Sequence, residues 1–219
     1  MNILLIDDHF CAREGVACLL RELFADVVIH QAERFDDGLA IARSQSLNWV
    51  LLDVQLPGKD GLLGLAELKR LFPNLSVVMY SGLDDRERVF EALQLGAMGF
   101  ITKSLPRHDF ISALQDIMAG KVVLPASVIA TQPATPSGRM RRPALDDLAL
   151  TKREMDVLGW VVQGKCNKEI ARKLGIEEQT VKNHLRPIFQ KFGVARRAEL
   201  LVKVFEQGLS FGRPDACNG

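Results

Sequence analysis

Four short, strongly apolar segments in the first half of the chain each lead to polar or small residues. The segments are Ile3–Ile6, Trp49–Leu52, Ser76–Tyr80 and Gly99–Thr102, with helical patterns between them. Runs of this kind are typical of parallel strands that helices cover on both faces. In an open α/β sheet, ligands bind beyond the carboxyl ends of the strands, so side chains far apart in sequence meet there. The sequence therefore predicts an α/β domain with a functional site at that edge.

The residues at this edge have the chemistry of an acidic pocket. They are Asp7, Asp8, Asp53, Ser81, Gly82, Phe100 and Lys103. Carboxylates are the hard oxygen ligands that Mg²⁺ prefers, and a carboxylate accepts a phosphoryl group when a metal and a cation hold the charge on its oxygens. We expect Asp53 to be the nucleophile, Lys103 to be that cation and Ser81 to donate a hydrogen bond.

Four motifs built on these residues resemble the receiver domain of response regulators. They are Asp7-Asp8, Asp53–Gly61, Ser81-Gly82 and Gly96–Lys103. The resemblance covers residues 1–124 and implies a doubly wound, five-stranded parallel sheet in the flavodoxin-like strand order.

The resemblance also implies a role for each member of the pocket. The Mg²⁺ ligands that it implies are Asp7, Asp8, Asp53 and the backbone carbonyl of Gln55. A phosphohistidine on a partner histidine kinase would be the phosphoryl donor. Ser81 and Phe100 would move together after phosphorylation, and Gly82, at a position where the family usually has alanine, would leave access to Asp53 open. The domain would catalyse only its own phosphoryl transfer and dephosphorylation. In that sense the protein would not be an enzyme, because it would not turn over a separate substrate.

These residues also have structural explanations. Acidic residues favour helix N-termini, so Asp7 and Asp8 are alternatively caps of a helix that begins near His9. Lys103 is alternatively a solvated lysine, and Phe100 a core residue, as a strand phenylalanine usually is. The convergence of complementary roles favours the pocket over these separate explanations.

Charge and composition divide the chain in two. The net charge of +1 conceals −5 over residues 1–124 and +6 over residues 125–219, which indicates partners of opposite character. Residues 125–145 carry four prolines and predict a partly extended linker. A second domain is expected over residues 146–208, followed by a disordered tail at 209–219.

We expect a cytoplasmic protein without a membrane partner. No basic leader precedes an apolar core, and no apolar stretch approaches the roughly 20 residues of a membrane helix. The cysteines are Cys11, Cys18, Cys166 and Cys217, none in a paired Cys-x-x-Cys spacing, which favours reduced thiols. The absence of a Gly-x-x-x-x-Gly-Lys loop argues against an ATPase module.

The second domain has the pattern of a small helical fold. The capping-box spacing of Thr151 and Glu154 predicts a helix start. A second helix is expected over residues 167–174 and a third over 178–192, each ended by a glycine, and residues 194–205 predict a fourth. Two helices joined by a tight turn with glycine form a helix-turn-helix motif, whose second helix enters the major groove of DNA.

Four motifs of this region resemble the LuxR-type DNA-binding domain. They are Leu150–Glu154, Gly164–Ala171, Thr180–His184 and Lys191–Val194. With the receiver-like part in front, the chain is similar to the NarL/FixJ family of two-component response regulators. The resemblance implies a homodimer on paired half-sites of promoter DNA, with the fourth helix serving dimer formation.

Helix geometry predicts which residues of the third helix contact DNA. Its apolar residues recur at three- and four-residue spacing, so the polar residues between them face outward. The expected base contacts are Lys182, Asn183 and Arg186. The expected phosphate contacts are Asn167, Lys168, Thr180 and Lys191. The alternative is a solvated helix face without a ligand.

Three residues of the second domain depart from the LuxR-type pattern. Pro187 removes one backbone hydrogen bond inside the third helix and is expected to kink it. The kink would change the direction in which the side chains of residues 182–186 point towards DNA. The alternative is a bend that the helix tolerates without a functional effect. Cys166 and Glu177 stand where serine is usual, so both helix starts lose a cap, and Asn167 is a candidate substitute for the first.

The sequence thus predicts a transcriptional regulator switched by phosphorylation of Asp53, which would control dimerisation and promoter binding. Two rival functions remain open. In one, the receiver is a protein-interaction module and DNA binding is independent of phosphate. In the other, a phosphatase uses Asp53 as its nucleophile, although no substrate-enclosing cap or second catalytic acid is evident.

Overall fold

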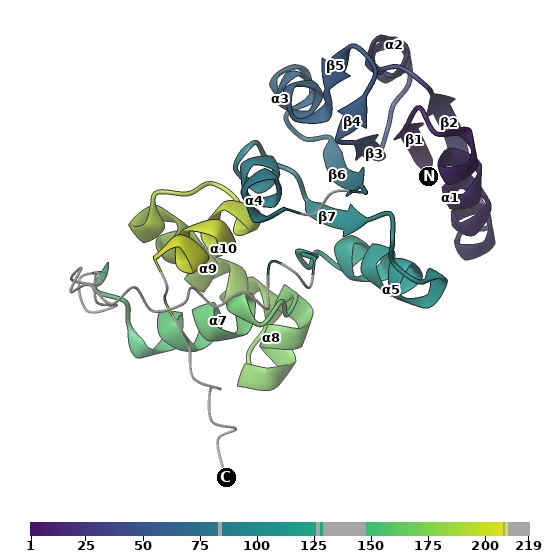
Figure 1. Cartoon of the computed structure of the whole chain (residues 1–219). Coiled ribbons are helices and arrows are strands. Elements are labelled where there is room, and N and C mark those ends of the chain that lie inside the picture. The colour runs from purple at the N-terminus through teal and green to yellow at the C-terminus, as the bar shows by residue number, and fades with distance from the viewer. Residues whose placement is uncertain (83–84, 126–127, 129–147, 208, 210–219) are drawn as a thin grey trace. The chain divides into compact units, whose positions relative to one another are not determined.

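The computed structural model describes residues 1–82, 85–125, 128, 148–207 and 209 (Figure 1). They divide into two compact units, one built mainly from residues 1–115 with 123–125 and 128, the other mainly from 148–209 with 116–122. The predicted linker and tail lie almost entirely outside the described residues. Among the described helices, none is long and apolar enough to cross a membrane.

The first unit is a five-stranded parallel sheet, as predicted (Figure 1). Its strands are β1 (Asn2–Ile6), β2 (Val28–Ala32), β3 (Trp49–Asp53), β6 (Ser76–Ser81) and β7 (Gly99–Thr102). Their order is β2-β1-β3-β6-β7, which is the flavodoxin-like order. The four apolar segments form the four strands other than β2. That strand lies at an edge and is only partly buried, so its sequence lacks the same apolar signal.

Five helices complete this unit. They are α1 (Phe10–Leu23), α2 (Phe35–Ser44), α3 (Gly61–Leu71), α4 (Arg86–Gln94) and α5 (Arg107–Met118). Helix α3 contacts both α2 and α4. Helices α1 and α5 are joined by an ion pair between Arg107 and Glu22, with Nη2 and Oε2 2.6 Å apart. Because the strands are parallel, their carboxyl ends lie side by side at the same end of the sheet. The loops that follow β1, β3, β6 and β7 therefore lie close together there.

A small hairpin that the sequence did not predict follows β3. It consists of β4 (Gln55–Leu56) and β5 (Lys59–Asp60), which are antiparallel. Gly58 between them has φ +79°, a conformation that glycine adopts without strain. The hairpin returns the chain to Asp60, whose side chain accepts a hydrogen bond from the amide of Leu62 and caps α3.

The second unit is a helical domain with one apolar core. Its helices are α7 (Lys152–Val162), α8 (Asn167–Leu174), α9 (Glu178–Phe192) and α10 (Arg197–Glu206). The predicted bounds of α8 and α9 are confirmed, and the glycines that end them, Gly175 and Gly193, have φ +63° and +64°. Buried residues from all four helices form the core.

Two local details of this unit differ from expectation. Helix α10 begins at Arg197 and not at Val194, because the side chain of Glu199 accepts the amide of Ala195 at 2.8 Å and organises the turn before the helix. At the start of α8, Cys166 and Glu169 form a capping box in which Glu169 accepts the amide of Cys166 at 3.0 Å. Asn167 is not the substitute cap, because its side-chain oxygen accepts from Arg197 at 3.3 Å.

Candidate functional site

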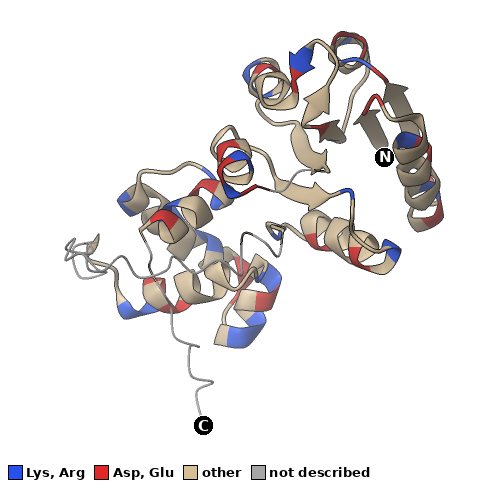
Figure 2. Cartoon of the chain, in the orientation of Figure 1, with Lys and Arg blue, Asp and Glu red and all other residues tan. Residues whose placement is uncertain are grey.

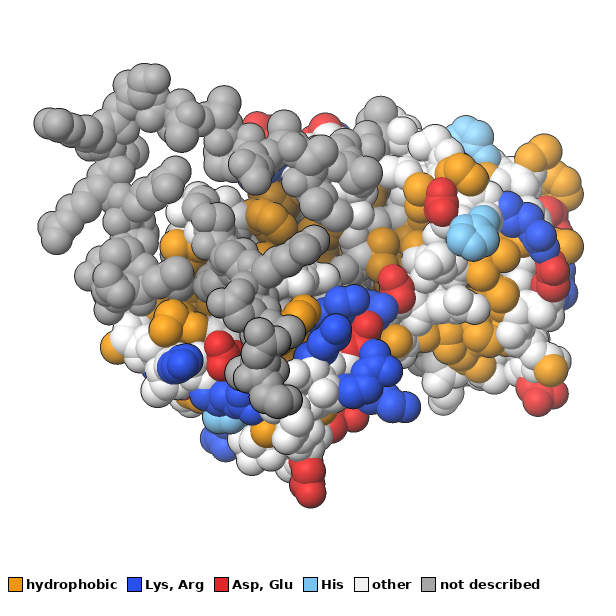
Figure 3. Space-filling view, turned by 90° about the horizontal axis from the view of Figure 1, so that it is seen from below, with side chains coloured by type: hydrophobic (Ala, Val, Ile, Leu, Met, Phe, Trp, Pro, Cys, Tyr) orange, Lys and Arg blue, Asp and Glu red, His pale blue; other side chains and the backbone are white. Residues whose placement is uncertain are grey.

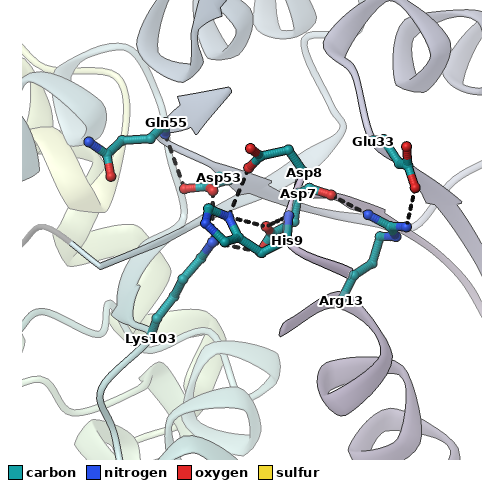
Figure 4. A network of polar contacts seen from close by, with 8 residues as sticks. All are labelled: Asp7, Asp8, His9, Arg13, Glu33, Asp53, Gln55 and Lys103. Carbon is teal, nitrogen blue, oxygen red and sulfur yellow. Dashed lines mark hydrogen bonds and ion pairs between the residues drawn. The ribbon is translucent and has the colours of Figure 1, made fainter. Parts of the chain in front are cut away.

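The carboxyl ends of the central strands bring the predicted pocket together (Figure 4). Asp7 follows β1, Asp53 ends β3, and Lys103 follows β7. The parallel register pairs Asp53 with Tyr80 and Ser81 with Thr102, so these residues lie along one edge. The main-chain amide of Lys103 donates to the carbonyl of Ser81 at 2.7 Å, which fixes the start of the loop that carries the lysine.

One ammonium group joins two buried carboxylates in this pocket. The Nζ of Lys103 lies 2.7 Å from Oδ2 of Asp53 and 2.7 Å from Oδ2 of Asp7. Asp53 is 2% exposed and Asp7 3%. The other oxygen of Asp53 accepts the amide of Gln55 at 3.1 Å, and that of Asp7 accepts the amide of His9 at 2.8 Å. Both carboxylates are therefore held in fixed orientations.

Burial and charge act in opposite directions on this cluster. Burial raises the pKa of Asp53 above its ordinary value, and the hydrogen bonds from Lys103 and Gln55 offset only part of that effect. Burial by itself would lower the pKa of Lys103, but its hydrogen bond to Asp53 and its ion pair with Asp7 outweigh burial, and the pKa is raised. A carboxylate whose charge is costly in this way is stabilised by any added cation.

The pocket suits a divalent cation. One ligand atom from each of Asp7, Asp8, His9 and Asp53 lies within 4.8 Å of the others. Asp7 Oδ2 and Asp8 Oδ1 are buried and accept no well-aligned hydrogen bond, although Lys103 Nζ lies 2.7 Å from the first and His9 Nδ1 2.9 Å from the second. Oxygens with unfilled lone pairs fit the preference of Mg²⁺ for hard ligands.

The structure discriminates among the alternatives that the sequence left open. The N-cap residue of helix α1 is His9, whose side chain makes no cap hydrogen bond, while Asp7 Oδ1 accepts the amide of His9 at 2.8 Å. Asp7 therefore restrains the start of the helix as well as lining the pocket, so the two explanations do not exclude each other. Lys103 is 18% exposed and paired, so it is not a solvated lysine. Phe100 is 1% exposed, as a core residue would be. Its predicted movement on phosphorylation stays a prediction.

The remaining members line the same edge. The side chain of Ser81 is fully buried, whereas Gly82 is exposed. A Cβ at Gly82 would meet no atom within 4 Å, whereas one at Gly61 would lie 2.1 Å from the carbonyl oxygen of Asp53. Only glycine therefore allows the start of α3 to approach the strand end that carries Asp53.

Two residues that the sequence analysis did not assign to the pocket adjoin it. His9 touches Asp8, and its position directly after the aspartate pair was an available signal. Arg13 donates to the carbonyl of Asp7 at 2.5 Å. A single arginine on an amphipathic helix gives no sequence signal of burial, since most arginines are exposed.

Helix α9 presents the predicted base contacts outward. Its apolar side chains at 181, 185, 188 and 192 are buried, while Lys182, Asn183 and Arg186 are exposed. Lys182 lies 3.8 Å from Glu178, and Asn183 accepts a bond from Gln179 at 3.3 Å. These contacts are weak and solvent-accessible, so the side chains are available to a ligand. This unit carries many Lys and Arg residues, several of them on α8 (Figure 2). Figure 3 shows a group of Lys and Arg side chains lying together on one face.

The predicted phosphate contacts differ in whether their side chains are exposed or already bonded to other parts of this unit. Lys168 is exposed and Thr180 partly buried. The side-chain oxygen of Asn167 accepts from Arg197 at 3.3 Å. Lys191 donates to Glu154 at 2.6 Å and to the carbonyl of Ala149 at 2.8 Å, which ties the end of α9 to the start of α7.

Helix α9 runs unbroken through Pro187. A residue with an amide at this position would bond the carbonyl of Asn183, and proline cannot. The effect of this lost bond on the aim of the outward side chains stays a prediction.

Comparison with known proteins agrees with both units. The response regulator receiver domain matches residues 3–115, and the luxR family of bacterial regulatory proteins matches residues 148–204. The Glycerol metabolism activator of Pseudomonas putida is 35% identical over 209 residues, covering 92% of this chain and 93% of that protein. The Nitrate/nitrite response regulator protein NarL of Escherichia coli K12 is 34% identical over 206 residues, covering 94% and 95%.

A solved structure is similar to part of the chain. The crystal structure of a LuxR family DNA-binding response regulator from Silicibacter pomeroyi is 34% identical, with a TM-score of 0.52, and the match covers 58% of this chain and 98% of that one.

Proposed function

The chain belongs to the NarL/FixJ family of DNA-binding two-component response regulators, and from that premise we propose that phosphorylation of Asp53 by a partner histidine kinase controls its dimerisation and promoter binding. The observation that carries this proposal is the ion pair between Asp53 and Lys103, buried beside two further carboxylates. A nucleophile, a cation and a set of metal ligands meet there as phosphoryl transfer requires.

In the proposed reaction, a carboxylate oxygen of Asp53 bonds to phosphorus as the bond from phosphorus to the histidine nitrogen of the kinase breaks. Lys103, already 2.7 Å from Asp53, shifts its ammonium to a phosphoryl oxygen, and the hydroxyl of Ser81 donates a hydrogen bond to another. Mg²⁺, when bound by Asp7, Asp8, Asp53 and the backbone carbonyl of Gln55, supplies further neutralisation of the phosphoryl charge. The exposed Gly82 leaves the approach open, and water entering the same way hydrolyses the acyl phosphate.

Phosphorylation then changes the receiver through packing. The new charge draws Ser81 towards the phosphoryl group, and Phe100 moves with it. Because Phe100 is now 1% exposed, any change in its rotamer alters the packing around it. A coupling of about 1–3 kcal/mol between this change and dimer formation is enough for a useful switch.

The helical unit supplies DNA recognition. Helix α9 lies in the major groove, where Lys182, Asn183 and Arg186 contact base edges. The proposed phosphate contacts are Asn167, Lys168, Thr180 and Lys191. Lys168 is the most available of these, whereas the ammonium of Lys191 already bonds Glu154. A dimer places two such helices on paired half-sites.

Intact-protein mass spectrometry tests the chemistry. The protein is incubated with a small acyl-phosphate donor, with and without Mg²⁺, beside the Asp53→Asn variant. The proposal requires one labile phosphoryl group that needs both Mg²⁺ and Asp53. A stable modification, or one that persists in Asp53→Asn, contradicts it. Turnover of an external phosphate ester that disappears in Asp53→Asn would instead support the phosphatase alternative.

A further inference from the structure

Arg13 is a buried cation that the proposed chemistry does not use. It lies on the first turn of α1 and is 6% exposed. Its guanidinium donates in three directions: to the carbonyl of Asp7 at 2.5 Å, to Gln31 Oε1 at 2.9 Å and to Glu33 Oε1 at 2.9 Å. Figure 4 shows it beside the pocket, on the side away from Asp53.

Every polar group of Asp7 is restrained, and Arg13 supplies one of the restraints. The amide of Asp7 donates to the carbonyl of Ala32 at 3.1 Å, and its own carbonyl accepts from Arg13. Its two carboxylate oxygens meet the amide of His9 and the ammonium of Lys103. The carbonyl that accepts from Arg13 belongs to the peptide that joins Asp7 to Asp8. The guanidinium therefore restrains the orientation of that peptide, and with it the directions of both side chains.

The surroundings of Arg13 orient it for this bond. Gln31 donates from Nε2 to Glu14 at 2.8 Å, which turns its oxygen towards Arg13. Glu33 balances the charge from a position that is 68% exposed. A guanidinium is the only side-chain cation with a rigid fork of five N–H donors, so lysine can replace only part of the network.

We propose that Arg13 is a positioning residue of the metal pocket. The pocket brings carboxylates of Asp7, Asp8 and Asp53 within 4.8 Å of one another, where like charges repel. By fixing the Asp7–Asp8 peptide, Arg13 prevents the loop between β1 and α1 from relaxing outward. It touches neither the cation nor the phosphoryl group. This inference rests on the proposed function, because it assigns a role in Mg²⁺ binding at the same site.

The test is Mg²⁺ affinity, measured by titration calorimetry on the full chain, with urea unfolding of each variant alongside. Arg13→Met is expected to weaken Mg²⁺ binding about tenfold, the lower end of the effect of outer-shell partners on metal sites. Arg13→Lys should recover part of that loss. Arg21→Met, the same change at an exposed position of the same helix, should leave the affinity unchanged. At saturating Mg²⁺, the phosphorylation rate of Arg13→Met should approach that of the wild type.

A purely structural role would lower the unfolding midpoint and leave the Mg²⁺ affinity of the folded protein unchanged, and that result overturns the proposal. Should Arg13→Met not fold, Arg13→Lys decides by the same criterion: unchanged affinity overturns the proposal, and weaker affinity supports it. If the wild type binds Mg²⁺ and is phosphorylated on Asp53 while both variants match it, only the role of Arg13 fails. If the wild type binds no Mg²⁺, the proposed function fails as well.

Discussion

The ammonium of Lys103 lies 2.7 Å from Oδ2 of Asp53, and both groups are largely withdrawn from solvent. This pair places the cation of a phosphoryl-transfer site beside the nucleophile before any phosphate arrives. Such preorganisation lowers the cost of reorganisation in the transition state. The same ammonium also meets Asp7, so it holds together residues from the ends of β1 and β3.

Replacing Lys103 with methionine should separate metal binding from phosphoryl transfer. Removing one hydrogen-bond donor that acts on the transition state typically costs about 10²–10³-fold in rate, so acyl-phosphate formation should fall by that order. Mg²⁺ affinity should be kept or improved, because a cation that competes for Asp7 and Asp53 is gone. Stopped-flow rates and calorimetry measure the two quantities. A loss of Mg²⁺ binding with an unchanged rate at saturating Mg²⁺ would show that Lys103 acts on the metal site alone.

The salt dependence of DNA binding should distinguish the two proposed phosphate lysines. Lys168→Met should reduce the slope of log affinity against log salt concentration by about 0.9, the value for one phosphate contact on duplex DNA. Lys191→Met should reduce it less, because its ammonium bonds Glu154 and Ala149. Fluorescence anisotropy at several salt concentrations gives the slopes. Equal slopes for wild type and Lys168→Met would remove Lys168 from the interface.

Lys191→Met should instead lower stability. It leaves Glu154, which is 5% exposed, without its cation, although the amide of Thr151 still donates to it. Because Lys191 is 29% exposed, the loss should fall below the 3–5 kcal/mol typical of fully buried pairs, at about 2 kcal/mol. Urea unfolding in a Trp49→Phe background, followed by the fluorescence of Trp160, reports on this unit.

Pro187→Ala tests whether the proline aims the recognition helix. Restoring an amide that can bond the carbonyl of Asn183 should stabilise the domain by about 1–3 kcal/mol. If the proline re-aims Lys182 to Arg186, affinity and sequence preference must change as well. Selection from a random duplex pool measures both. Greater thermal stability with unchanged affinity and preference would identify Pro187 as a tolerated bend.

The elements that the sequence predicted well are those with a local cause. The bounds of α8 and α9 follow from Gly175 and Gly193, and four strands follow from continuous apolar runs. Strand β2 was not located, because half-exposed edge residues such as His30 and Gln31 give no apolar run.

The composition of the pocket was predictable because its members follow strand ends, where parallel topology brings them together. The hydrogen-bond partner that each side chain takes could not be predicted from the sequence. Asn167 was a candidate substitute for the cap of α8, but Cys166 and Glu169 form a capping box there. Arg13 and His9 join the pocket through contacts that depend on how α1 packs, which no local pattern specifies.

Acid should destabilise the helical unit through Glu154 and Glu169. Although burial opposes them, hydrogen bonds from Cys166 lower the pKa of Glu169 to about 2, and those from Lys191 and Thr151 lower the pKa of Glu154. Each folded-state pKa lies below the ordinary value of 4.5. Each carboxylate therefore stabilises the fold above pH 4.5, and that stabilisation is lost as the pH falls towards the folded value. Because Glu169 is partly exposed and solvent screens its interactions, the amount at neutral pH should be about 1–2 kcal/mol.

The two tryptophans allow the acid destabilisation of the helical unit to be measured in the full chain. Trp49 lies in β3 and Trp160 in α7, so Trp49→Phe leaves a reporter in the helical unit alone. In that background, Glu169→Gln should flatten the dependence of stability on pH between 4.5 and about 2. An unchanged pH profile would mean that Glu169 does not carry the effect.

The most direct test of the central claim is the affinity of the full chain for duplex DNA before and after phosphorylation, with Asp53→Asn treated identically. The duplex is one that the phosphorylated protein selects from a random pool. Coupling of about 1–3 kcal/mol predicts that phosphorylation tightens binding by about 5- to 150-fold, with formation of a dimer, and that the donor has no effect on Asp53→Asn. Equal affinity of the phosphorylated and unphosphorylated proteins would contradict the switch and establish DNA binding that is independent of phosphate.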